Sequence, residues 1–168
     1  MIDDVTDGWE ELEARLRVVE SRLGIGATDR PPLPDPETFW VLDGLRARGE
    51  EGVVFAGDVS TAAGPVAWQY GLPAEALLAP DGGSLDTASS RLAALGHPVR
   101  LRLLLAVLRG TTSPAELAEV PGTGTSGQIY HHIRALTAAG WLRSVGRGQV
   151  HVPAERVVPL LAALATAL

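Results

Sequence analysis

Two helix starts with the same capping pattern follow each other closely in the second half of the chain, and they constrain its fold most. Ser113 and Glu116 match a capping box, in which a hydroxyl residue caps the start of a helix and a Glu or Gln three residues later bonds back to its backbone amide. Thr125 and Gln128 repeat the pattern, and the Pro-Gly pair at 121–122 interrupts the chain between them. Two short capped helices joined by a tight turn predict a helix-turn-helix.

The flanking segments extend this prediction. Apolar residues recur at helical spacing before it, and alternating residues around the Gly-Arg-Gly turn at 146–148 predict a short β-hairpin with a basic tip after it. Pro159 places the firm start of a closing helix near Val158, or a kink there. The expected elements are helices from Ser84 or Asp86 to 95, over 98–109, 113–119, 125–139 and 155–168, and a hairpin over 141–152.

The first segment carries a heptad pattern. Apolar residues start at Ile2 and recur at alternating steps of three and four, which is typical of a coiled coil, and Arg15 would meet Glu20 of a parallel partner. We therefore predict a dimerisation helix over 1–24; an amphipathic helix packed on its own domain is the alternative. The predicted dimerisation residues are Val5, Trp9, Leu12, Leu16, Val19 and Leu23.

The middle of the chain is less distinctive. Residues 25–36 are rich in proline and predict a linker, and residues 37–83 predict an accessory region made of a helix and a β-hairpin. Phe55, Trp68 and Tyr70 of that hairpin would line a ligand pocket, widen a dimer interface or cover the following domain. We favour dimerisation and packing, so the role of a small-molecule effector stays open.

Charge is unevenly divided along the chain. Residues 1–87 hold 17 acidic residues and 6 arginines, whereas residues 88–168 hold 3 acidic residues and 8 arginines. A basic half joined to an acidic half indicates that one end meets a polyanion such as nucleic acid.

Several function classes lack their sequence signals. The chain has no cysteine, so thiolate metal sites and disulfides are excluded, and its histidines are not spaced as a ligand cluster. Its start is acidic, and no apolar run approaches a membrane span, so we expect a cytoplasmic protein without a membrane partner. No nucleophile elbow, phosphate-binding loop or zinc-protease motif occurs, so we expect neither enzymatic activity nor a cofactor.

Three segments resemble a known family in order and spacing. They are Leu95-Gly-His-Pro-Val-Arg-Leu-Arg-Leu-Leu104, Ala115-Glu-Leu-Ala118, and His131-His-Ile-Arg-Ala-Leu136 followed by Ala139 and Gly140. Together they resemble the ArsR-like winged helix-turn-helix regulators of bacteria, over about residues 84–168. The expected fold is therefore mainly α with small β, a winged helix-turn-helix domain over 84–168 preceded by the coiled-coil helix and the helix plus hairpin.

The resemblance implies a homodimeric transcriptional regulator, by family default a repressor, whose recognition helix enters the major groove of double-stranded DNA while the wing reaches the minor groove or the backbone. Metal-sensing members use ligands on their terminal helices that this chain lacks, so we expect no metal site. The alternative is a winged-helix module that binds protein without reading DNA.

Position within such a fold selects the candidate contacts. Ile129, Ile133 and Leu136 form the apolar stripe of the second capped helix, which leaves its other side to DNA. His132 faces the stripe and is expected to be structural, and Gln128 is expected either to cap the helix or to contact adenine. The candidate DNA-binding residues are Thr125, Ser126, Gly127, Gln128, Tyr130, His131, Arg134, Arg143 and Arg147.

Overall fold

The computed structural model describes residues 12, 15, 16, 19, 35 and 37–168, apart from the side chain of Arg147. It separates the chain into two units, residues 1–44 and 45–168. The described heptad positions are helical and exposed, namely Leu12, Leu16 and Val19. The other predicted seam and linker positions lie outside the described residues: Ile2, Val5, Trp9, Leu23, 25–34 and 36.

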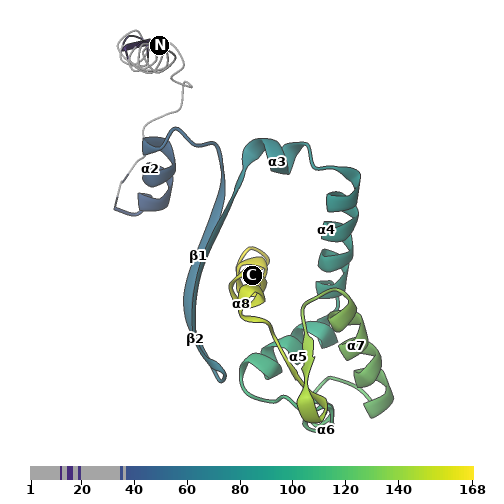
Figure 1. Ribbon diagram of the computed structural model, residues 1–168. Coiled ribbons are helices and arrows are strands. Elements are labelled where there is room, and N and C mark those ends of the chain that lie inside the picture. The colour runs from purple at the N-terminus through teal and green to yellow at the C-terminus, as the bar shows by residue number, and fades with distance from the viewer. Residues whose placement is uncertain (1–11, 13–14, 17–18, 20–34, 36) are drawn as a thin grey trace, which may run out of the picture. The chain divides into compact units, whose positions relative to one another are not determined.

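The described residues form a mainly helical fold with two small antiparallel sheets, which confirms the predicted fold class (Figure 1). The elements are α2 (Trp40–Ala47), β1 (Gly52–Thr61), β2 (Gly64–Pro73), α3 (Ala74–Leu78), α4 (Gly82–Leu95), α5 (Pro98–Leu108), α6 (Pro114–Ala118), α7 (Ser126–Ala138), β3 (Arg143–Val145), the 3-10 turn η1 (Gly146–Gly148), β4 (Gln149–His151) and α8 (Ala154–Ala165). No helix in this part of the chain is long and apolar enough to cross a membrane.

Most helices begin where the sequence predicts. The amide of Glu116 donates to the Ser113 hydroxyl over 3.2 Å, and the Ser113 amide donates to the Glu116 carboxylate over 3.4 Å, so the capping box of α6 is confirmed. Helix α4 differs, because Asp81 caps it in place of Ser84 or Asp86. The Asp81 carboxylate accepts both the amide and the hydroxyl of Ser84, over 2.8 and 2.6 Å, and therefore satisfies more of the helix end than Ser84 alone would.

Two further elements depart from the prediction. Helix α8 begins at Ala154 and contains Pro159, because burial of Val157 and Val158 stabilises the turn before the proline. The first hairpin is longer than expected. Its two ten-residue strands are antiparallel, with Gly52 opposite Pro73 at one end and Thr61 opposite Gly64 at the other. Helix α3 follows directly after this hairpin and was not anticipated.

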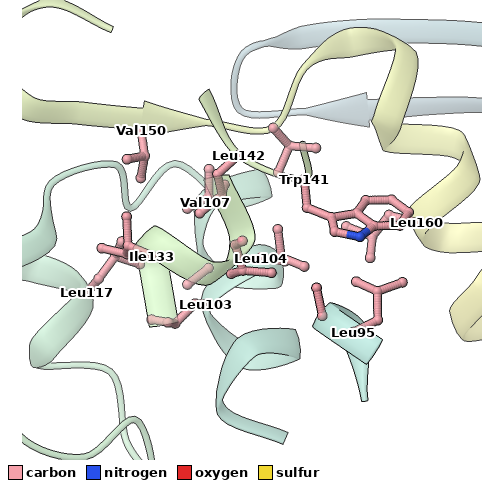
Figure 2. Close-up of a cluster of buried hydrophobic side chains, with 14 of the residues drawn as sticks. Leu95, Leu103, Leu104, Val107, Leu117, Ile133, Trp141, Leu142, Val150 and Leu160 are labelled. Atoms are coloured by element: carbon pink, nitrogen blue, oxygen red, sulfur yellow. The ribbon is translucent and has the colours of Figure 1, made fainter. Parts of the chain in front are cut away.

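The core lies where α4 to α8 and the second hairpin meet (Figure 2). It combines large aliphatic residues from every one of these helices with Trp141, which joins α7 to β3. The Trp141 indole N–H donates to the Arg91 carbonyl of α4 over 2.9 Å, so this ring joins α4 to the segment between α7 and β3. The fully buried members are Leu103, Leu104, Leu117, Ile129, Leu136, Leu142 and Leu160.

The β1–β2 hairpin packs against α8 within the same unit (Figure 1). Val59 and Val66, an opposed pair near its tip, pack against the core. The Ala62 amide in the hairpin loop donates to the Leu108 carbonyl at the end of α5 over 3.0 Å. The hairpin is thus held both by apolar contacts and by a backbone hydrogen bond.

Gly57 allows the close approach of the hairpin to α8. A Cβ atom at Gly57 would lie 2.9 Å from Cγ1 of Val158, whereas a Cβ at Gly127 in α7 would meet nothing within 4 Å. Gly57→Ala is therefore expected to lower the free energy of unfolding by about 1–3 kcal/mol through overpacking. Gly127→Ala, the matched control, should leave it unchanged or raise it by up to about 1 kcal/mol. Urea denaturation measures both, and equal effects of the two substitutions would contradict this packing.

Candidate nucleic-acid interface

Helix α7 has a buried side and an exposed side. Ile129, Ile133 and Leu136 are buried, as the apolar stripe predicts. Tyr130 is 61% exposed, and Arg134, one helical turn further on, is also exposed. Their spacing with Gly127 places them on one stripe that faces away from the core, with His131 at its edge.

The side chain of Gln128 caps the N-terminus of α7. Its side-chain oxygen accepts the amide of Thr125 over 2.9 Å and the Thr125 hydroxyl over 3.3 Å. Gly124 has a φ of +93°, and a Cβ at that position would lie 2.5 Å from the same oxygen, so the cap needs glycine there. A bidentate contact of Gln128 with adenine would require this oxygen to leave the cap.

The turn between α6 and α7 is held by two polar side chains that sequence reasoning missed. Thr123 is buried, and its hydroxyl donates to the Val120 carbonyl over 2.6 Å, with the Leu117 carbonyl at 3.2 Å. The Arg102 guanidinium of α5 donates to the Gly122 carbonyl over 3.2 Å. The available signal was a lone threonine between two turn glycines, which also fits an ordinary surface loop.

The second hairpin forms the predicted wing. In it, Arg143 of β3 pairs with His151 of β4 at one end, and Val145 pairs with Gln149 at the other. The turn η1 carries Arg147 at the tip. The Val150 amide donates to the Thr112 carbonyl over 2.9 Å, which ties the base of the wing to the loop between α5 and α6. The wing therefore leaves the domain from a fixed base.

Arginines around the wing are partly engaged within the chain. The Arg143 guanidinium pairs with the Glu155 carboxylate over 2.7 Å. A backbone hydrogen bond and the nearby Arg143 lower the pKa of Glu155, so this acid stays ionised beside a candidate contact. Arg156 lies over the Trp141 ring at 5.7 Å, and burial together with Arg91 lowers its pKa. Arg134 has no hydrogen-bond or ion-pair partner among the described residues.

Three histidines gather between α5 and α7. The ring centroids of His97 and His132 lie 4.7 Å apart, and those of His131 and His132 lie 5.8 Å apart. Burial lowers the pKa of His132, and His97, His131 and Arg100 lower it further. Among the residues the structure describes, no group of three His, Asp or Glu side chains is arranged to hold a metal ion.

An apolar cavity of about 500 Å³ lies at the tip of the first hairpin. Ala62 and Pro65 of the hairpin, Leu108 of α5 and Val157 of α8 contribute to its wall. The aromatic residues suspected of forming a pocket lie elsewhere: Phe55 and Tyr70 form a cross-strand pair with centroids 6.0 Å apart, and Trp68 is partly exposed.

Comparison with known proteins agrees with this geometry. A family model described as a helix-turn-helix domain matches residues 95–145, from the end of α4 to the end of β3. No curated protein matches the chain. The match and the fold together define a helix-turn-helix domain, and this supports a DNA-binding regulator in general terms.

The hydroxyl of Thr123 gives a direct test of the turn. Thr123→Val keeps the side-chain shape but removes the hydrogen bond to two carbonyls, and it should lower the free energy of unfolding by about 1–3 kcal/mol. Thr137 on α7 also donates to a carbonyl, that of Ile133 over 2.8 Å, but it is exposed, so Thr137→Val should cost less than about 0.5 kcal/mol. Urea denaturation compares the two; equal losses would contradict a special role of the buried hydroxyl.

His132 gives a test of pH dependence. Because its pKa in the folded protein lies below the ordinary value of 6.5, the unfolded chain binds protons first as the pH falls. Stability should therefore decrease on acidification from pH 7.5 to pH 5.5, while Asp and Glu side chains remain ionised. Urea midpoints measured for His132→Gln should show a smaller decrease; a decrease as large as that of the unmodified chain would refute the assignment.

Proposed function

We propose that this protein is a homodimeric, sequence-specific regulator of transcription that binds double-stranded DNA and represses by blocking polymerase. Helix α7 would lie in the major groove, and the β3–β4 wing would reach the minor groove or the backbone. The observation that carries the proposal is the exposed stripe of α7, with Tyr130 and Arg134, within a helix-turn-helix whose turn is held by hydrogen bonds from a buried threonine and an exposed arginine.

The charge of the domain supports nucleic acid as the partner. Residues 88–168 carry 8 arginines against 3 acidic residues, and Arg134 is exposed without an internal partner among the described residues. Such cations give DNA binding its affinity and its salt dependence. A small apolar effector in the cavity at the hairpin tip would be compatible with this role, since that cavity adjoins both α5 and α8.

Each region has a proposed part in the regulator. Residues 1–24 form the dimerisation helix, 25–36 the linker, 37–83 the accessory region and 84–168 the DNA-binding domain. Exposure of Leu12 and Leu16 on a helix, at 57% and 56%, supports a partner helix there. Leu85 and Leu92 of α4, seven residues apart, are also exposed and offer a second apolar contact between protomers.

Selection of duplexes from a random-sequence library with the full chain tests the proposal. Enriched duplexes should then bind more tightly than scrambled ones in fluorescence anisotropy, and the preference should survive at the higher of two salt concentrations. Failure to enrich any sequence would favour the alternative, a winged-helix module that docks on another protein.

Arginine variants locate the interface. Arg134→Ala and Arg147→Ala should each weaken binding of the selected duplex about tenfold, because each removes a cation from the proposed contact surface. Arg109→Ala removes the same charge at the far end of α5, beside the loop of the first hairpin, and should change affinity less than about twofold. Similar losses in all three variants would indicate a non-specific charge effect and would refute the assigned face.

A further inference from the structure

The histidine cluster bridges two elements of the helix-turn-helix domain. His97 precedes α5 and caps it, and His131 and His132 lie in the middle of α7. The ring of His132 is the central one, 4.7 Å from His97 and 5.8 Å from His131 between centroids. His131 is the exposed member, at the edge of the outward stripe of α7. The cluster thus extends from the interior to the proposed DNA-binding surface.

One of the three rings is committed to the fold. Nδ1 of His97 accepts the Val99 amide over 3.2 Å, which closes the first turn of α5. Protonation at that nitrogen would break the cap, so this ring contributes to the fold as well as to the cluster.

The surroundings of the cluster are electropositive. The side chains that shift the pKa of His132 are His97 and Arg100 from the α5 side and His131 on α7 itself, and all three lower it. The other helices packed against α7 contribute Arg91 and Asp86 from α4 and the acids Glu116 and Glu119 from α6; none of these four is among the causes of the shift. Glu116 is already engaged in the capping box.

Arg100 adds a second sign that negative charge is missing. Its Nε is buried and has no hydrogen-bond partner, although it lies in the same group of basic side chains. Buried histidines commonly pair with a carboxylate or a carbonyl that balances the proton. Here no acid is among the groups that shift the pKa of His132, so an anion that approaches from outside would meet basic side chains and no competing acid of that group.

We propose that His97, His131 and His132 form one proton-linked site for a backbone phosphate of DNA, which contacts His131 directly. The phosphate stabilises the imidazolium form of His131, and the same negative charge offsets the repulsion that keeps His132 neutral. DNA binding then takes up protons, so affinity increases as the pH falls. This inference rests on the proposed DNA-binding function and adds a regulation of its interface by pH.

Binding of the full chain measured at pH 6.0, 7.0 and 8.0, at constant salt concentration, tests the inference. The probes are the duplex selected from the library and a mixed-sequence duplex, since a backbone contact is present in both. One proton taken up gives at most about a tenfold change in affinity per pH unit, and we expect about 3- to 30-fold tighter binding at pH 6.0 than at pH 8.0.

Substitutions at His131 separate proton linkage from a structural effect. His131→Gln should lose most of the pH dependence and bind at pH 6.0 as the unmodified chain binds at pH 8.0. His131→Arg carries a permanent charge, so it should bind tightly at pH 8.0 with a reduced pH dependence.

The outcomes are distinct. Binding of either duplex with an affinity independent of pH, or a pH dependence that His131→Gln leaves intact, overturns the inference and leaves the proposed function standing. Absence of binding to both duplexes at every pH overturns the proposed function, and the inference with it. Urea midpoints of the variants at each pH verify that every affinity refers to a folded chain.

Discussion

The buried hydroxyl of Thr123 determines how α7 leaves the domain. It donates to the Val120 carbonyl over 2.6 Å, with the Leu117 carbonyl of α6 at 3.2 Å, and so fixes the turn between the two helices. Arg102 holds the next carbonyl, that of Gly122, from α5. Side chains that read base edges must be placed to within a fraction of a hydrogen-bond length. A turn held by its own buried threonine and by an arginine of α5 provides that precision, whereas a flexible loop would not.

The packing of the first hairpin on α8 joins the hairpin to the helix-turn-helix unit. Val157 and Leu160 of α8 face the core, whereas Val158 faces Gly57 of the hairpin. Because α8 is covered on both sides, less of its apolar surface is left for a second protomer. In the proposed dimer, the contacts would then come from other exposed apolar residues, such as those of α4 and the described heptad positions. A displacement of the hairpin would also break its hydrogen bond to the end of α5.

The sequence predicted the elements whose ends carry local signals. Ser113 with Glu116 and Thr125 with Gln128 act within one helical turn, and a pattern of four residues therefore identified α6 and α7. It left open whether Pro159 starts the closing helix or lies inside it, because burial against the core and the hairpin, which outweighs the loss of one backbone donor, does not appear in a local pattern. Nor could it find the contact of Arg102 with Gly122, because those residues are distant in sequence and meet only in the folded chain.

Charge counted along the sequence also overstates the charge available to a partner. Arg102 holds a turn, Arg143 pairs with Glu155, and Arg156 lies over Trp141, so three of the arginines in the basic half already have internal contacts. To contact a phosphate, Arg143 would first have to separate from Glu155. Because this ion pair is exposed, breaking it costs little free energy. Arg134 has no such contact among the described residues, so in the proposed complex it is available to a phosphate without a prior cost. Protonation of a histidine at the edge of the same helix face would add to this charge and so provide a means of tuning the proposed DNA binding.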